Sequence, residues 1–343
     1  MTDGLHFSII IANYNYGKYV AAAIASALQL DWPHVEVIVI DDGSTDASRD
    51  IISLFGAKVR AIYQENSGQR AANNVGFANS TGDVVIFLDA DDIVAPTLAR
   101  EVAGAWGSGV SKVQVQMSRV DAEGRSLGSI LPRFRRTPTP DQIRRWNHAC
   151  CEYPTPPGSG NAYSRAFLDK IFPIGKERDT STDTTCVAMA PFYGDVVTVA
   201  KPLVYYRVHG DNDSNLLRDD RHFAREVARA SQRLRASQDA GIARGLAAPR
   251  SSALFRGKHL LQLRIASLRL RPLEHPLAHD SRPRAFVDAV LAPFRSGFEP
   301  IERRLAITVW SLLTLLLPRP WAQQLILWRF ASSGVSRLRV EDQ

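Results

Sequence analysis

Cysteine is scarce in this sequence, which contains three in 343 residues. Cys150, Cys151 and Cys186 form an odd set without the CxxC spacing of a zinc site, and they are too few for a disulfide framework. The first residues also lack the basic segment and apolar run of a secretory signal peptide. We therefore expect a protein that is made and kept in the cytosol.

Long apolar runs are also missing. The longest strongly apolar stretch covers residues 305–317 and ends at Pro318. A helix of that length would be about 20 Å long, which is short of the roughly 30 Å of a bilayer's hydrocarbon core. The sequence thus predicts no membrane-spanning helix. It also has no G-x-G-x-x-G after an early strand pattern, which disfavours a dinucleotide-dependent oxidoreductase.

Positive charge is unevenly placed along the chain. The net charge is +7, and residues 1–205 carry −3 while residues 206–343 carry +10. With 45% hydrophobic and 22% charged residues, the composition is that of a globular protein and excludes wholesale disorder. The basic character of the C-terminal part therefore needs an explanation of its own.

Apolar strand patterns alternate with helical patterns through the first hundred residues. Strands are expected at 7–12, 35–40, 59–63 and 84–88, and helices at 17–30, 46–55 and 69–78. This alternation predicts βαβ units and an α/β fold with a doubly wound, mostly parallel sheet. Less regular patterns follow, with a helix at 97–106, strands at 113–117, 195–199 and 203–206, and loops at 132–140 and 153–160.

The most informative stretch is 84–92, VVIFLDADD, an apolar strand that ends in three aspartates. A second strand, 35–40, runs into the acidic segment 41–46, DDGSTD. Asp-rich turns are common because Asp caps helices, yet here two strands deliver acids to one carboxyl edge of a parallel sheet, where ligands bind. Because carboxylate oxygens suit Mg²⁺ or Mn²⁺, the pattern indicates a metal-nucleotide site.

Four segments together resemble the family 2 glycosyltransferases. In chain order they are 8–15 (SIIIANYN), 41–46 (DDGSTD), 66–76 (NSGQRAANNVG) and 88–92 (LDADD). The resemblance runs from His6 to about Asn212. It implies a GT-A fold and an inverting, metal-dependent transfer of a sugar from a nucleotide-sugar donor. The motifs specify the donor half and not the acceptor.

The resemblance also implies a division of the chain. Residues 1–214 would form the GT-A catalytic domain, with a nucleotide-binding half at 1–95 and an acceptor half at 96–214. The small residues of 156–161 place that loop on the acceptor side. Residues 215–343 have Arg-rich helical patterns without a strand pattern, so we expect a basic, C-terminal helical extension.

Three residues are implied to bind the nucleotide. Asp42 would accept a hydrogen bond from the imide N–H of a uracil or thymine ring, because a carboxylate is an acceptor only. Tyr14 would stack on the base, although it also fits an ordinary aromatic residue at a strand end. Arg70 would meet the ribose or the phosphates, and it fits a solvated helix residue equally well.

Three further residues are implied to serve the metal. Asp91 would bind Mn²⁺ or Mg²⁺ directly, and Asp89 would reach the ribose or the metal's water shell. His209 would complete the metal shell or contact the diphosphate, since a neutral imidazole is a metal ligand. The cation would bridge the two phosphates of the donor.

An inverting transfer also needs a base that takes the proton of the acceptor hydroxyl. The resemblance implies a Glu-Asp pair for this base, at the start of a helix and ahead of a Tyr-Arg-x-His segment. Here 177–186 reads ERDTSTDTTC and 206–209 reads YRVH. Asp183 is the preferred base, with Asp179 as its rival because Thr182 stands where Glu is expected. Asp183 also fits a helix N-cap.

The basic C-terminal part suggests contact with a membrane surface. Five arginines at helical spacing would form one positive stripe, namely Arg218, Arg221, Arg225, Arg229 and Arg233. Residues 301–317 and 321–330 combine large apolar side chains with flanking arginines, as segments in a membrane interface do. We predict peripheral attachment to the anionic inner face of the cell membrane. A helical module packed on the catalytic domain is the alternative, and no motif indicates nucleic acid.

The sequence therefore predicts transfer of a sugar from a UDP- or dTDP-sugar to a hydroxyl of a glycan or lipid-linked glycan precursor. Two alternatives from other classes stay open. A sugar-phosphate nucleotidylyltransferase would need a Gly-rich, Arg-containing loop after the first strand, which 12–17 does not supply. A non-catalytic module that retains the nucleotide site would differ from an enzyme in showing no metal-dependent release of UDP.

Overall fold

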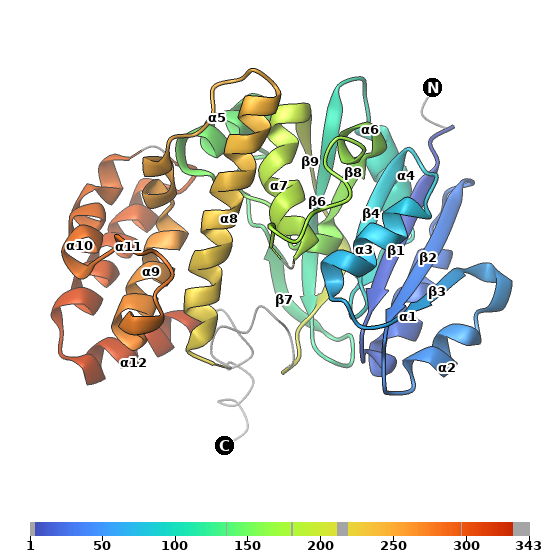
Figure 1. Ribbon diagram of the computed structural model, residues 1–343, viewed down its shortest axis with the longest axis horizontal. Coiled ribbons are helices and arrows are strands. Elements are labelled where there is room, and N and C mark those ends of the chain that lie inside the picture. Colours follow the sequence, from blue (N-terminus) through green and yellow to red (C-terminus); the bar gives the residue numbers. More distant parts are fainter. Residues whose placement is uncertain (1–3, 135, 180, 211–218, 296, 332–343) are drawn as a thin grey trace. The chain divides into compact units, whose positions relative to one another are not determined.

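A computed structural model describes residues 4–134, 136–179, 181–210, 219–295 and 297–331. The chain divides into two compact units, coloured along the sequence in Figure 1. The first comprises Met1–Ile143 and Pro154–Arg207, and the second comprises Arg144–Tyr153 and Val208–Gln343. The second unit thus begins ahead of residue 215, and it includes a segment that the sequence-based division left in the acceptor half.

The first unit is built on a nine-stranded sheet. Its strands are β1 (Phe7–Asn13), β2 (Val35–Asp42), β3 (Arg60–Gln64), β4 (Val84–Asp89), β5 (Ile93–Val94), β6 (Val110–Val120), β7 (Ser126–Leu131), β8 (Asn161–Ser164) and β9 (Asp195–Arg207). Their spatial order is β3-β2-β1-β4-β8-β6-β9-β5, with β7 beside β6. The strands β1 to β4 are parallel to one another, while β8 runs antiparallel to β4 and β6. The predicted α/β fold with a mostly parallel sheet is confirmed.

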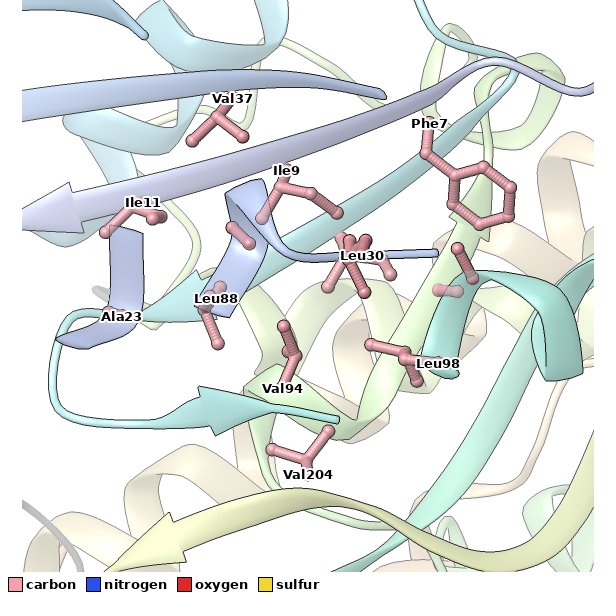
Figure 2. Close-up of a cluster of buried hydrophobic side chains, with 14 of the residues drawn as sticks. Phe7, Ile9, Ile11, Ala23, Leu30, Val37, Leu88, Val94, Leu98 and Val204 are labelled. Carbon is pink, nitrogen blue, oxygen red and sulfur yellow. The ribbon is translucent and has the colours of Figure 1, made fainter. Parts of the chain in front are cut away.

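Helices cover both faces of this sheet. They are α1 (Gly17–Leu28), α2 (Ser48–Ser53), α3 (Gln69–Ala78), α4 (Leu98–Gly104), α6 (Arg165–Leu168) and α7 (Thr182–Tyr193). Helix α5 (Pro140–Cys150) begins in the first unit and continues into the second. Ile9 and Ile11 of β1 pack in one core cluster with Ala23 of α1 (Figure 2). Ile10 approaches Gly76 of α3 instead. Because successive side chains of a strand point to opposite faces, α1 and α3 lie on opposite sides of the sheet.

Parallel pairing brings the carboxyl ends of three strands to one edge. Asn13 of β1 lies beside Asp41 of β2, and Ala12 lies beside Asp89 of β4. The side-chain amide of Asn13 donates a 3.1 Å hydrogen bond to Asp41. The acidic segments after β2 and β4 therefore lie on either side of the end of β1, as the strand pattern predicts.

Some elements differ from the prediction. The two strands expected at 195–199 and 203–206 are one strand, β9. The Lys201-Pro202 pair interrupts the apolar pattern, but the pairing of β9 with β6 shifts register close to Pro202, and such irregularities accommodate proline in a sheet. The short strands β5 and β8, the outer strand β7 and helix α5 gave no periodic signal long enough to be recognised.

The second unit is helical. Its longer helices are α8 (Arg221–Ala243), α9 (Lys258–Leu270), α10 (Arg282–Leu291), α11 (Ile301–Leu316) and α12 (Arg319–Ala331). Nearly every residue of α9 is buried, and α9 contacts α8, α10, α11 and α12. The unit therefore has a hydrophobic core of its own around α9. In the part of the chain that the structure describes, no helix has both the length and the apolar character needed to cross a bilayer.

The arginine stripe that the sequence suggested is only partly open to solvent. Arg225, Arg229 and Arg233 have intermediate exposure in α8. The side chain of Arg229 is 15% exposed and pairs with Glu226 at 2.7 Å. Arg218 lies outside the described residues. These arginines take part in the packing of the helical unit, so the stripe is not a free cationic face.

Candidate active site

A small cavity lies at the carboxyl edge of the sheet in the first unit. Its volume is about 50 Å³. Its walls include Asp89 at the end of β4, Gln69 and Asn73 of α3, Gly158, and Asp183 of α7. The fold thus brings Asp89 and Asp183 to one cavity, although they are far apart in sequence.

Asp183 is held in the first turn of α7. Ser181 Oγ donates a 2.5 Å hydrogen bond to Asp183 Oδ1. Asn73 of α3 donates a 2.9 Å hydrogen bond to Thr182 Oγ1, which fixes the start of α7 against α3. A helix N-terminus also favours negative charge. The arrangement presents a fixed carboxylate, a group able to accept a proton, at the cavity wall.

Arg70 and Asp179 meet next to this helix start. Arg70 Nη1 donates to the backbone carbonyls of Arg178 at 2.9 Å and Asp179 at 3.3 Å. Arg70 therefore ties the beginning of α3 to the segment that precedes α7. Of the two candidates for the base, Asp183 is the one that lines the cavity.

The acidic turn after β4 contains one fully buried carboxyl group. Asp92 accepts hydrogen bonds from Ser159 Oγ at 2.6 Å and from the backbone N–H of Arg207 at 3.0 Å. Burial raises the pKa of Asp92 well above its usual range, and the negative charges of Asp91 and Asp89 raise it further. The three aspartates of this turn are therefore close enough to repel one another.

The backbone of Asp91 is bonded to Arg207. Asp91 is 9% exposed, and its carbonyl accepts a 2.8 Å hydrogen bond from Arg207 Nε. Arg207 also donates from Nη1 to the carbonyl of Ala122 at 2.6 Å. Arg207, the arginine of the Tyr-Arg-x-His segment, thus holds the acidic turn through a backbone carbonyl. Asp91 is not among the residues that line the cavity.

The acidic turn fits a hard divalent cation. Carboxylate oxygens are the ligands that Mg²⁺ and Mn²⁺ prefer, and a cation would offset the repulsion that raises the pKa of Asp92. Among the described residues, no three His, Cys, Asp or Glu side chains are grouped to hold a metal. Mg²⁺ is usually bound by one or two carboxylates together with substrate phosphates, so a two-carboxylate site remains consistent with metal-nucleotide binding. His209 belongs to the second unit, and its role as a ligand stays a prediction.

Tyr14 and Asp42, the two residues predicted to bind the nucleobase, differ in exposure. Tyr14, just after β1, is 46% exposed, as stacking on a ligand requires. Asp42 is 3% exposed and accepts hydrogen bonds from Gln64 Nε2 at 2.6 Å and from the N–H groups of Ser67 at 2.9 Å and Gly68 at 2.7 Å. Asp42 therefore shapes the loop before α3, and base recognition by Asp42 stays a prediction.

Sequence reasoning missed two residues that organise the site. Ser159 bonds to Asp92, and its Oγ also accepts a 3.1 Å hydrogen bond from the N–H of Asp89. Lys112 of β6 is fully buried and donates to Thr155 Oγ1 at 2.9 Å and to Asn161 Oδ1 at 2.8 Å. A lysine within the otherwise buried, strand-like segment 110–117 was the signal available for Lys112. Ser159 gave none, because it stands in an ordinary loop composition.

Burial and charge act on Lys112 in opposite directions. Burial lowers the pKa of Lys112 well below its usual value, and the negative charge of Asp183 acts against this. Cys186, one turn further along α7, faces the same lysine, and burial raises the pKa of its thiol. The site thus has a buried amino group behind the carboxylate that lines the cavity.

Comparisons with known proteins place this chain among relatives of one kind. Residues 8–172 match the family model described as Glycosyl transferase family 2. The uncharacterized glycosyltransferase alr2836 of Nostoc sp. is 36% identical over 218 residues, which are 61% of this chain and 66% of that protein. The putative glycosyltransferase EpsH of Bacillus subtilis is 26% identical over 212 residues, or 59% and 60% of the two chains. The chain thus spans less than two thirds of the length of these relatives.

Solved structures show the same fold. Residues 1–349 of TarS from S. aureus have a TM-score of 0.51 at 17% identity, covering 91% of this chain and 90% of that one. The same TarS segment in complex with UDP-GlcNAc has a TM-score of 0.50 at 17% identity, with the same coverage. At this identity the likeness concerns the fold alone, and the predicted GT-A fold is confirmed.

Proposed function

We infer the function from one premise: over residues 8–172, the chain belongs to glycosyl transferase family 2. We propose that it transfers a sugar from a UDP- or dTDP-sugar to a hydroxyl group of a glycan or a lipid-linked glycan precursor. The observation that carries this proposal is the position of Asp89 and Asp183 at one cavity. The uridine or thymidine nucleotide is proposed from the carboxylate of Asp42, which is an acceptor only and suits the imide N–H of these bases.

On the donor side, Asp91 would hold Mn²⁺ or Mg²⁺ beside the diphosphate, and Asp89 would reach the ribose or the metal's water shell. A bound cation would stabilise the negative charge that develops on the departing diphosphate. Tyr14 stacks on the base with its exposed ring. The loop shaped by Asp42 leads into the start of α3, where Arg70 would meet the ribose or the phosphates.

On the acceptor side, Asp183 is the general base. The acceptor oxygen attacks the anomeric carbon while its proton passes to Asp183, and the bond between that carbon and the diphosphate oxygen breaks. The hydrogen bond from Ser181 and the anchored start of α7 keep the carboxylate oriented for this step. Attack from the face opposite the diphosphate inverts the configuration at the anomeric carbon.

The proposal is tested by measuring release of UDP from UDP-sugars in the presence of Mn²⁺ and an acceptor extract. Asp183→Asn should lower kcat by a factor of about 10² to 10⁴, because it removes the base and keeps the side-chain shape. Donor affinity in titration calorimetry should stay unchanged. Asp179→Asn is the matched control, and we expect it to retain most of the activity. An Asp183→Asn protein with wild-type kcat would overturn the assignment of the base.

The same assay separates the other function classes. Chelation by EDTA should abolish UDP release and added Mn²⁺ should restore it, while Asp91→Ala should lower the apparent affinity for Mn²⁺. A non-catalytic module would bind the nucleotide without releasing UDP. A nucleotidylyltransferase would instead form a nucleotide-sugar from a sugar phosphate and a nucleoside triphosphate, with release of pyrophosphate.

A further inference from the structure

The surface of the helical unit is unusually apolar between Phe286 and Trp328. Of the 22 large apolar side chains that are exposed in the described residues, 13 lie between Phe286 and Trp328. Within the same unit, α8 exposes only Ile242 among its large apolar residues, near its C-terminal end. The two parts of one unit therefore present different chemistry, and the apolar part is far larger than scattered surface residues would give.

Helix α11 shows this most clearly. Its exposed apolar residues recur every three or four positions along one face: Ile301, Leu305, Val309, Leu313 and Leu316. They are between 44% and 70% exposed. The opposite face, with Ile307, Trp310 and Leu315, is buried in the core around α9. The helix is thus apolar on both faces, and only one face has a partner within the described part of the unit.

Helix α12 and the end of α10 extend this surface. Trp321 and Trp328 of α12 are 66% and 72% exposed, and Phe294, just after α10, is 85% exposed. Helix α11 contacts both α10 and α12, so the three helices form one continuous layer over α9. We call the 13 exposed apolar residues between Phe286 and Trp328 the apolar face.

A basic pocket adjoins the apolar face on α10. It has a volume of about 390 Å³, and its walls include Phe255, Asp288 and the three arginines Arg256, Arg284 and Arg295. The guanidinium of Arg284 lies 4.1 Å from the ring centre of Phe255. Arg295 pairs with Asp288 at 2.7 Å, whereas neither Arg256 nor Arg284 has a carboxylate partner among the described residues. The pocket walls therefore carry three arginines and one aspartate, and that aspartate is already paired with Arg295.

The pocket and the apolar face are neighbours by helical geometry. Along α10, Arg284 lies next to the exposed Val287 and Leu291 on one side and to the buried Ala285 on the other. An anionic group in the pocket would therefore have an apolar surface directly beside it. That combination of a negative head and an apolar body is the chemistry of a phospholipid.

We propose that the helical unit binds the surface of an anionic membrane, with the apolar face in the acyl boundary and Arg256 and Arg284 at the lipid phosphates. Exposed tryptophans suit this depth, because their rings are apolar and their N–H groups are polar. The arginines proposed to contact the membrane are therefore Arg256 and Arg284, and not the arginine stripe of α8 that the sequence suggested. The proposal is independent of the transfer reaction.

Charge decides between a membrane and a second copy of the chain. Residues 282–331 carry seven arginines and three acidic residues. Two copies joined through the apolar face would bring these positive charges together, which opposes association. An anionic bilayer has the opposite charge and attracts each nearby arginine. The observations therefore favour the membrane.

Flotation of the full-length protein tests the proposal directly. Vesicles of phosphatidylcholine and phosphatidylglycerol in equal parts should bind the protein, and phosphatidylcholine vesicles should bind it much more weakly. The double variant Arg256→Gln, Arg284→Gln should weaken vesicle binding by about 25-fold. Each arginine near the surface contributes a factor of roughly five, and the two factors multiply. This loss should become smaller as salt is added, because screening weakens the attraction that the arginines supply.

A second variant tests the apolar face. Leu305→Gln, Val309→Gln and Trp328→Gln change half-exposed side chains, so the fold should persist, and together they should weaken vesicle binding by about 100-fold. The matched control is Arg235→Gln with Ile242→Gln on α8, which should bind as the wild type does. Circular dichroism establishes that each variant is folded.

Four results would overturn the proposal. One is failure of the wild-type protein to bind anionic vesicles. Another is equal binding by the wild type and the variant of the apolar face. The third is a concentration-dependent dimer in analytical ultracentrifugation that the apolar variant abolishes, which would assign the face to a second copy. Displacement of vesicles by inorganic phosphate alone, with no effect of the apolar variant, would reduce the site to a free anion site.

Discussion

The ammonium group of Lys112 donates a 2.8 Å hydrogen bond to the side-chain oxygen of Asn161, and both residues are buried. The amide of Asn161 in turn donates to the carbonyls of Pro157 at 3.0 Å and Gly158 at 3.2 Å. Gly158 lies against the carboxylate of Asp89. A buried lysine on β6 therefore orders the loop that forms one wall of the cavity, while the negative charge of Asp183 in α7 counteracts the lowering of the pKa of Lys112 by burial.

Replacement of Lys112 should affect both stability and catalysis. Lys112→Met removes the 2.8 Å hydrogen bond to the buried oxygen of Asn161, which keeps a longer bond of 3.3 Å from Thr155 Oγ1, so we expect the free energy of unfolding to fall by about 1 to 3 kcal/mol. Because Asn161 orders the loop that carries Gly158 at the cavity wall, the rate of UDP release should fall as well.

Urea unfolding and the initial rate of UDP release measure these two effects. Lys201→Met is the control, since Lys201 is a surface residue of the same unit that pairs with Glu101 at 2.6 Å. We expect this control to change stability by less than about 1 kcal/mol and to leave the rate of UDP release unchanged. A wild-type rate for Lys112→Met would show that the lysine contributes to stability alone.

Ser159 should be required for the stability of the acidic turn. Ser159→Ala removes the 2.6 Å hydrogen bond to the buried Asp92 and the acceptor of the Asp89 N–H group. We expect a loss of about 1 to 3 kcal/mol in the free energy of unfolding, because buried polar groups lose their partner. Urea denaturation measures it. Ser53→Ala, at an exposed position of α2, should be nearly neutral by comparison, and equal losses would contradict the prediction.

Gly76 should tolerate no side chain. A Cβ atom there would lie 2.4 Å from Ile10 Cγ2 and 2.8 Å from Ile40 Cδ1. Gly76→Ala should therefore destabilise the protein by about 1 to 3 kcal/mol through overpacking, in spite of the better helix propensity of alanine. The cost should be smaller when Ile10 is also changed to alanine, which a double-mutant cycle in thermal unfolding measures.

Gly104 of α4 offers the matched control for Gly76. A Cβ atom at Gly104 would meet nothing within 4 Å. Gly104→Ala should therefore raise the free energy of unfolding, by up to about 1 kcal/mol, because alanine loses less backbone entropy in a helix. If both glycines respond alike, close packing of α3 on the sheet is not what requires Gly76.

Asp280 should make the helical unit sensitive to acid. Burial alone would raise the pKa of Asp280, but hydrogen bonds from His275 at 3.1 Å and Arg264 at 2.7 Å and 2.8 Å lower it well below its usual range. A carboxyl group with a lowered pKa in the folded state stabilises that state above the pKa of the unfolded chain. This stabilisation is lost as the pH falls toward the folded-state pKa.

Asp280→Asn should therefore cost about 3 to 5 kcal/mol at neutral pH, because it leaves the buried Arg264 without its full partner. The difference from the wild type should shrink in urea titrations carried out below the normal pKa of aspartate. Glu274→Gln breaks the exposed pair with Arg271 and should cost less than about 1 kcal/mol at either pH. A difference that stays constant with pH would contradict the role of the Asp280 carboxylate.

The sequence by itself determined the order of the first strands and helices. The alternation of periods near two and near 3.6 residues is a local property, so it predicted β1 to β4 and α1 to α4 close to their observed bounds. It also determined that acids follow two parallel strands, because the carboxyl ends of such strands share one edge. The family followed from the order of four short motifs.

Only the tertiary structure decided which of these residues meet. It put Asp183, and not Asp179, on the cavity wall with Asp89, and it bound Asp42 to the loop before α3. It gave Lys112 and Ser159 their roles, and it packed part of the arginine stripe of α8 into the helical unit. Each of these outcomes depends on contacts between segments far apart in the chain. Residue periodicity cannot encode such contacts, because it records which face of an element is apolar and not what that face touches.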